Sequence, residues 1–175
     1  SSDLERNRNV HVVTGKPVES GGSAGRDKAT GQGLVFVLAA WAKDHGLDLR
    51  GATYTIQGFG NVGSWTARLL KPLGAVMVAV EDHSGAIVNS AGIDPDDLAF
   101  YVEEHGRLQG YEGGEPVDHQ AFFETEADIF IPAALENQVT AETAPWLNVD
   151  LVVEGANGPT DIEGDKILQA KDIQV

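Results

Sequence analysis

Residues 52–82 restrict the fold more than any other part of the chain, because they follow the order strand, glycine turn, helix, strand. Residues 52–58 (ATYTIQG) are short, β-branched and bounded by glycines, which is typical of a strand. Residues 61–74 (NVGSWTARLLKPLG) have a helical pattern that a proline and a glycine end. Residues 75–82 (AVMVAVED) form a continuous apolar strand of the kind that a parallel sheet buries on both faces. The segment therefore predicts two parallel strands joined by a crossover helix.

The same alternation continues on both sides of this segment. The other expected elements are helices at 30–46, 94–106 and 160–172, a helical turn at 140–147, and strands at 127–132, 149–158 and 173–175. The glycine-rich residues 15–25 and 110–116 are expected to be loops. Strands and helices that alternate at these lengths predict an α/β fold with a doubly wound, mostly parallel Rossmann-type sheet and helices on both faces.

The composition narrows the class of protein. The 175 residues suffice for one domain with a buried core. No apolar run approaches the roughly 20 residues needed to cross a bilayer, and no secretory signal opens the chain, so we expect a soluble, cytoplasmic protein. The formal net charge of −15 argues against nucleic acid and anionic membranes as partners. Such an acidic surface is typical of adaptation to salt, and an acidic mesophilic protein would have it too.

The sequence predicts no metal site. It contains no cysteine, which excludes disulfides, thiolate metal sites and cysteine nucleophiles. Its 5 histidines lie far apart, without the i, i+4 pair or the H-E-x-x-H pattern of a helical zinc site. We expect these histidines to be solvated surface side chains.

Gly58, Gly60 and Gly63 have the spacing G-x-G-x-x-G, which alone occurs in many chains by accident. Here the motif follows an expected strand and opens an expected helix, which is the setting that binds a dinucleotide. Gly58 would permit the tight turn, Gly60 the approach of the backbone to a pyrophosphate, and Gly63 the packing of helix on strand. The helix N-terminus would offer N–H groups to the phosphates. A glycine-rich turn without a ligand is the alternative.

An acidic residue should end the second strand about 20 positions after the glycines. Glu81 and Asp82 stand at that distance. We assign the role to Glu81, whose carboxylate would accept hydrogen bonds from the adenosine ribose hydroxyls and repel a 2′-phosphate. The sequence therefore predicts NAD as the cofactor, in preference to NADP.

Four stretches resemble the coenzyme-binding domain of glutamate dehydrogenase in their order and spacing, from about Val13 to the end of the chain. They are VTGKPVESGGSAGRDKATGQG (13–33), IQGFGNVGSW (56–65), IPAALENQVT (131–140) and VVEGANGPT (152–160). The related leucine and phenylalanine dehydrogenases share the glycine loop and resemble residues 134–140 and 154–160 less well. The resemblance implies the reversible oxidative deamination of L-glutamate to 2-oxoglutarate and ammonia with NAD.

The resemblance extends the set of expected cofactor-binding residues, which are Thr30, Gly58, Gly60, Asn61, Val62, Gly63, Glu81, Ala133, Ala134 and Asn157. By resemblance, Thr30 and Asn61 would hold the nicotinamide end of the cofactor and Asn157 the nicotinamide ribose. The backbone of Ala133 and Ala134 would pass beside the adenosine. Each position also has a structural explanation: a helix N-cap or helix start for Thr30 and Asn61, an Asn-Gly turn for Asn157, and tight packing for the alanines.

Arg26 matches an arginine that the family has near its active-site cleft. By resemblance it would orient the substrate or contact the other domain, and a surface arginine paired with acids is the alternative. Lys28 stands where many relatives have glutamate, which is a departure in this loop. We interpret residues 1–29 as an interdomain, hinge-side segment and residues 30–175 as the NAD-binding Rossmann-type domain.

No catalytic residue is assigned, because the family's catalytic lysine and aspartate lie in an N-terminal substrate domain whose motifs this sequence does not contain. The chain begins without methionine and ends within an apolar run, so we interpret both ends as cuts through a longer protein. We expect it to bind NAD, as a monomer taken from a homo-hexameric parent, without turning over L-glutamate or 2-oxoglutarate. The alternatives are a stand-alone NAD-binding or NAD-sensing module and a leucine- or phenylalanine-type dehydrogenase domain.

Overall fold

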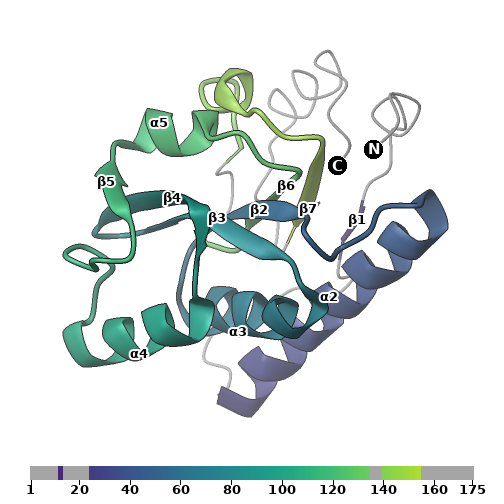
Figure 1. Cartoon of the computed structure of the whole chain (residues 1–175), viewed down its shortest axis with the longest axis horizontal. Helices are drawn as coiled ribbons and strands as arrows, with labels where there is room; N and C mark the ends of the chain where they lie inside the picture. The colour runs from purple at the N-terminus through teal and green to yellow at the C-terminus, as the bar shows by residue number, and fades with distance from the viewer. Residues whose placement is uncertain (1–11, 14–23, 135–138, 155–175) are drawn as a thin grey trace.

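A computed structural model describes residues 12–13, 24–134 and 139–154, which form a seven-stranded sheet with helices (Figure 1). The strands are β1 (Val12–Val13), β2 (Thr53–Gln57), β3 (Val76–Asp82), β4 (Gly85–Ile93), β5 (Glu115–Val117), β6 (Ile129–Pro132) and β7 (Leu151–Glu154). The helices are α2 (Ala24–His45), α3 (Asn61–Leu70), α4 (Pro95–His105) and α5 (His119–Glu124), with short 3-10 helices η1 (Lys71–Leu73) and η2 (Ala144–Trp146).

The sheet has the order β1-β7-β6-β2-β3-β4-β5. From β1 to β3 all neighbours pair in parallel, whereas β4 and β5 continue the sheet in antiparallel pairs. The predicted doubly wound, mostly parallel α/β sheet is confirmed. The chain adds β3 on one side of β2 and later returns to add β6 on the other side. In open sheets of this kind, ligands bind where the strand order reverses, which here is at the carboxyl ends of β2 and β6.

Helices cover both faces of the sheet, as predicted (Figure 1). The first face carries α2, α3 and α4, and its core includes Leu38, Ile56, Leu70, Leu98 and Ile131. The second face carries α5 and η2, and its core includes Phe122, Phe123, Phe130, Leu147 and Val152. Side chains of a strand point alternately to opposite faces, so consecutive residues Phe130 and Ile131 of β6 belong to different cores.

The predicted start of the first long helix is wrong. Helix α2 begins at Ala24, and Thr30 lies inside it, so the explanation of Thr30 as a helix N-cap is wrong too. Four of residues 24–29 (AGRDKA) are alanine, arginine or lysine, which favour helix and outnumber the less favourable Gly25 and Asp27. The helix ends at His45, before Gly46 with φ 71°, as predicted.

Helices α3 and α4 begin and end as predicted. Helix α3 passes into η1 and stops at Gly74, which has φ 87°. Helix α4 has Pro95 as its first residue and Asp94 as its N-cap, whose side chain accepts a hydrogen bond from the Asp96 N–H at 2.9 Å. Gly106 ends it with φ 74°.

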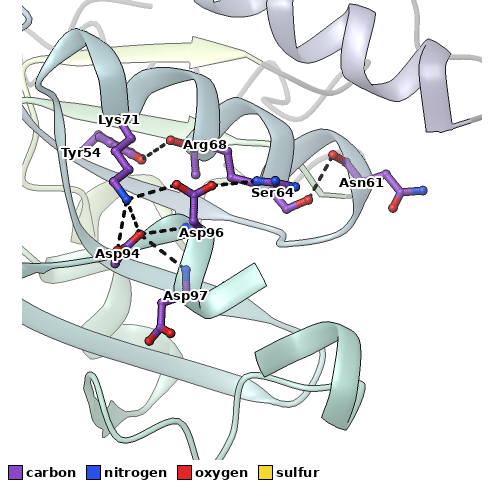
Figure 2. A network of polar contacts seen from close by, with 9 residues as sticks. Tyr54, Asn61, Ser64, Arg68, Lys71, Asp94, Asp96 and Asp97 are labelled. Carbon is purple, nitrogen blue, oxygen red and sulfur yellow. Dashed lines mark hydrogen bonds and ion pairs between the residues drawn. The ribbon is translucent and has the colours of Figure 1, made fainter. Parts of the chain in front are cut away.

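Ion pairs join these two helices at the surface (Figure 2). The Lys71 ammonium lies 3.0 Å from Asp94 and 3.1 Å from Asp96, and Arg68 Nε lies 2.9 Å from Asp96. Hydrogen bonds to Asp94 and then Asp96 raise the pKa of Lys71, and those from Arg68 and Lys71 lower the pKa of Asp96. Slight burial opposes ionisation of Asp94, but bonds from Lys71 and from two main-chain N–H groups outweigh it and lower its pKa.

Four elements were not predicted from the sequence, namely the two-residue strand β1, strands β4 and β5, and helix α5. Strand β4 carries small and polar residues in its middle and has no regular burial pattern. Strand β5 has three residues and begins inside the stretch 110–116 that was expected to be a loop. Helix α5 has six residues, too few to show a helical period, although Asp118 caps it by accepting the Ala121 N–H at 2.7 Å.

Two further properties concern the described part of the chain. None of its helices is both long and apolar enough to cross a membrane. Its histidine, aspartate and glutamate side chains form no group of three or more that could hold a metal ion.

Candidate functional site

The first glycine of the motif lies where three strand ends meet. The Gly58 N–H donates to the Glu81 carbonyl at the end of β3 at 2.7 Å, while the Ala133 N–H after β6 donates to the Gln57 carbonyl of β2 at 2.8 Å. Gly58 has φ 98°, and a Cβ there would stand 2.9 Å from the Ala133 carbonyl group and from the Ala134 Cβ. Only glycine suits both this conformation and this approach. The motif therefore lies at the ends of β2, β3 and β6, where the strand order reverses.

Contacts in the structure explain the third glycine of the motif but not the second. A Cβ on Gly63 would stand 2.0 Å from the Gly58 carbonyl oxygen, so the packing of α3 on β2 demands glycine there. A Cβ on Gly60 would meet no atom within 4 Å among the described residues. Gly60 has φ −78° and ψ −157°, which any L-residue adopts. No described residue explains Gly60, and among the described residues none occupies the space that its missing side chain leaves.

Helix α3 begins directly after this open space. Gly60 is its N-cap and supplies no side chain to cap the first turn, which also contains no acidic residue. The N-terminal N–H groups of a helix and its dipole suit phosphate. Asn61 is exposed and Val62 half-buried, and the Asn61 carbonyl accepts the Ser64 hydroxyl at 3.3 Å (Figure 2). The turn thus presents open backbone and a helix N-terminus at one point.

Glu81 lies beside this turn, with its carboxylate held by two side chains that sequence reasoning did not identify. Its Oε1 accepts from the Gln57 amide at 2.9 Å, and its Oε2 lies 2.8 Å from Nδ1 of His119 on α5. The Glu81 side chain is 11% exposed. An ionised carboxylate offers about four acceptor positions, so both oxygens keep capacity for a further donor such as a ribose hydroxyl.

The neighbouring acid, Asp82, has a different environment. Its Oδ1 accepts from the Ser84 N–H at 2.7 Å and from the Ser84 hydroxyl at 2.5 Å, and its Oδ2 accepts from the Leu108 N–H at 3.1 Å. These bonds close the turn from β3 to β4 and fasten it to the segment after α4. Asp82 is therefore a structural residue of this turn.

The structure brings together the glycines, Glu81, Ala133 and Ala134, and places the other predicted residues as follows. Thr30 is half-buried on α2, where the next residue, Gly31, approaches α3 so closely that a Cβ there would lie 3.2 Å from the Thr66 nitrogen. Arg26 lies in the first turns of α2, and its side chain is outside the described part. Asn157 lies outside the described residues.

Lys28, the residue that departs from the family pattern, contacts an aromatic ring. Its ammonium lies 4.8 Å from the centroid of the Trp65 ring on α3, and the Arg68 guanidinium lies 4.3 Å from the same ring. A cation over an indole face is attracted to it, by about 0.5–1 kcal/mol at an exposed site. Lys28 thus links α2 to α3, a contact that a glutamate at this position would not make.

A cavity of about 570 Å³ lies away from these residues. It includes Thr53, which begins β2 and so lies at the opposite end of that strand from Gly58. Glu112, Glu115 and Glu126 contribute to its lining, and carboxylates repel the phosphates of a dinucleotide. We place the candidate site at the glycine turn, because its main-chain N–H groups suit an anion and the cavity's carboxylates do not.

Comparison with known proteins identifies the family to which this chain is similar. The model of the Glutamate/Leucine/Phenylalanine/Valine dehydrogenase family matches residues 21–175. Glutamate dehydrogenase of Thermotoga maritima is 47% identical over 166 residues, which are 94% of this chain and 40% of that protein. This chain thus spans about two fifths of that relative.

Solved structures of glutamate dehydrogenases are also similar to this chain. The hetero-hexameric glutamate dehydrogenase of Thermus thermophilus superposes with a TM-score of 0.77 at 36% identity, over 90% of this chain and 37% of that chain. Glutamate dehydrogenase of Peptoniphilus asaccharolyticus superposes with a TM-score of 0.66 at 38% identity, over 91% of this chain and 36% of that one. The chain belongs to the glutamate/leucine/phenylalanine/valine dehydrogenase family.

Proposed function

We propose that this chain is the coenzyme-binding domain of an NAD-dependent glutamate dehydrogenase, which converts L-glutamate, NAD and water into 2-oxoglutarate, ammonia and NADH. The observation that carries the proposal is Gly60, which no contact in the described protein requires to be glycine. A ligand that approaches the backbone explains it. The relatives named above support glutamate as the substrate of the whole protein, because they are glutamate dehydrogenases.

The described residues fit a dinucleotide in distinct ways. The pyrophosphate would lie over Gly60, where the N–H groups of the first turn of α3 are directed at it. Glu81 would accept hydrogen bonds from the adenosine ribose and repel a 2′-phosphate, which favours NAD over NADP. Thr30, Asn61 and Asn157 would orient the nicotinamide end, by resemblance to the family. NAD itself supplies the hydride acceptor, and the protein's task here is to bind and orient it.

The remaining machinery of the reaction would come from elsewhere in the whole protein. The family's catalytic lysine and aspartate match no stretch of this sequence, so we expect NADH binding by the 175-residue chain without turnover of L-glutamate. Arg26 would face the substrate or the second domain. A homo-hexamer is proposed for the whole protein.

Calorimetric titration of this chain with NADH tests the proposal, with Gly60→Ala as the decisive variant. The new methyl group meets no described atom and suits the backbone angles of Gly60, so the variant should fold like the wild type. The methyl group would stand where the pyrophosphate approaches the backbone. We expect NADH affinity to fall roughly tenfold or more, since a misplaced pyrophosphate would lose charge-assisted hydrogen bonds of about 1.5–3 kcal/mol each.

Gly33→Ala is the matched control. Gly33 is exposed on α2, and a Cβ there also meets no atom within 4 Å. This substitution should leave NADH affinity unchanged and stabilise the protein by about 0.5–1 kcal/mol, because alanine favours helix over glycine. Wild-type affinity in Gly60→Ala, or no saturable binding of NADH by the wild type, would contradict the proposed function.

A further inference from the structure

His119 contacts the carboxylate that we place beside the adenosine ribose. It is the first residue of α5, far from Glu81 in the sequence, and its Nδ1 lies 2.8 Å from Glu81 Oε2. The imidazole side chain is 52% exposed, whereas that of Glu81 is 11% exposed. The Glu81 carboxylate is thus nearly buried, and the imidazole that contacts it is half exposed to solvent.

The surroundings fix this pair in one arrangement. The Gln57 amide holds the other carboxylate oxygen at 2.9 Å. The imidazole ring meets the Phe123 ring at 5.0 Å between centroids and the Trp146 ring at 6.2 Å, in both cases edge to face. The main chain of Glu81 accepts the Gly58 N–H at 2.7 Å. The pair is therefore connected directly to the glycine turn and has little freedom to turn away from it.

We propose that His119 is a specificity-determining residue that sets, through Glu81, how strongly the site rejects a 2′-phosphate. The inference rests on the proposed function, in which Glu81 lies beside the adenosine ribose. With a neutral imidazole, Nδ1 donates to the carboxylate and the pair carries one negative charge. With a protonated imidazole, the net charge of the pair is zero, so repulsion of a 2′-phosphate falls. Histidine changes its charge between about pH 5 and pH 8, so discrimination between NAD and NADP becomes dependent on pH.

Three other titratable side chains, Asp82, Asp118 and His83, are close to this pair in the sequence and could also affect its charge. Asp82 is engaged by Ser84 and Leu108 at the β3–β4 turn, and Asp118 caps α5 through the Ala121 N–H. His83 is 78% exposed, with its ring 4.0 Å from Asp82. His83 is thus the rival source of any pH dependence at this end of β3.

The test is the ratio of the dissociation constants of NADPH and NADH, measured by calorimetry on the 175-residue chain at about pH 5.5 and about pH 8.5. His119→Asn is the main variant, because its amide N–H lies near the position of Nδ1 and does not titrate. In the wild type, the ratio should be lower at the acidic pH, by on the order of tenfold relative to His119→Asn at the same pH. At the alkaline pH the two proteins should have the same ratio.

Comparison at equal pH is essential, because the 2′-phosphate itself changes its charge near pH 6. That titration is common to both proteins, and only the difference between them reports on His119. Glu81→Gln keeps hydrogen-bonding groups and removes the charge, so its ratio should be low at both pH values. His83→Asn and the remote His105→Asn, whose histidine Nδ1 contacts the Tyr101 carbonyl on α4, should behave like the wild type.

The outcomes separate this inference from the proposed function. NADH binding with equal ratios in wild type and His119→Asn at both pH values overturns the role of His119 and leaves the proposed function standing. The role of His119 is also overturned if His83→Asn loses the pH dependence of this ratio while His119→Asn keeps it. Absence of NADH binding overturns both. If His119→Asn fails to fold by circular dichroism, His119→Gln replaces it with the same expected results.

Discussion

Gly63 and Gly58 approach so closely that a Cβ on Gly63 would stand 2.0 Å from the Gly58 carbonyl oxygen. The clash is with main chain, which cannot rotate away as the tip of a side chain would. Gly60, between them, has no such neighbour in the described structure. The motif therefore contains two glycines that packing requires, Gly58 and Gly63, and one, Gly60, that no contact in the described structure requires.

Gly63→Ala should destabilise the protein, because α3 must move away from β2 to admit the methyl group. We expect the free energy of unfolding to fall by about 1–3 kcal/mol, the range for overpacked sites. Urea denaturation measures it. Gly60→Ala is the comparison and should show no comparable loss; similar losses in both variants would contradict this separation of roles.

Asp94→Ala should weaken α4 more than Asp94→Asn does. Alanine removes both the N-cap acceptor for the Asp96 N–H and the ion pair with Lys71, while asparagine removes only the charge. Loss of an N-cap costs about 1 kcal/mol, and an exposed ion pair contributes less. Thermal or urea unfolding of the two variants measures the difference. Equal destabilisation would show that the ion pair, and not the cap, is the larger contribution.

The stabilising effect of Asp96 should disappear in acid. Hydrogen bonds from Arg68 and Lys71 lower the pKa of Asp96 in the folded protein, so its contribution is present above the unfolded pKa of about 3.9 and is lost as pH falls through the folded value. The difference in unfolding free energy between wild type and Asp96→Asn should be present near neutral pH and vanish in strong acid. The difference is expected to be below about 1 kcal/mol, because the pair is exposed.

The contribution of Lys71 to stability should depend on pH in the opposite direction. Its pKa is raised by hydrogen bonds to Asp94 and Asp96, so its contribution is complete below the unfolded pKa and lost as pH rises through the folded value. Lys71→Met should therefore differ from the wild type in unfolding midpoint at neutral pH and converge with it in strong alkali. A difference that persists there would show that the lysine stem acts by packing.

Added salt should stabilise the protein. The net charge of −15 implies repulsion between acidic side chains in the folded state, and salt screens it. The melting temperature should rise in NaCl, by roughly 2–4 °C for each 1 kcal/mol gained. Screening is largely complete by a few tenths molar, so most of the rise should occur below about 0.3 M. A rise proportional to concentration up to 1 M would instead indicate exclusion of salt from the surface.

The sequence predicted those parts of the fold whose signals are local. Strands β2, β3, β6 and β7 are apolar runs between turn residues, and α4 has its cap, proline and terminal glycine within a few residues. Strand β5 and helix α5 could not be predicted in this way. With three and six residues, they are too short to show a period and depend on the sheet for their conformation.

The candidate site likewise has features that local sequence signals predict and features that they do not. Glycine spacing and an acid after the second strand placed Gly58, Gly63 and Glu81 together, and the structure confirms that they are neighbours. The partners of the Glu81 carboxylate come from β2 and α5, at separations of 24 and 38 residues. Contacts over such distances are decided by the packing of α5 on the sheet, which no local pattern encodes.

Strand β5 also affects how readily another extended chain could pair with this edge of the sheet. It is the outermost strand beyond β4, and its middle residue is Pro116, which has no N–H to donate. Glu115 adds a negative charge at the same border. Another extended chain would find few donors and a repelling charge there, so two copies gain little by joining their sheets along this border. These three residues therefore disfavour aggregation by strand pairing along this border.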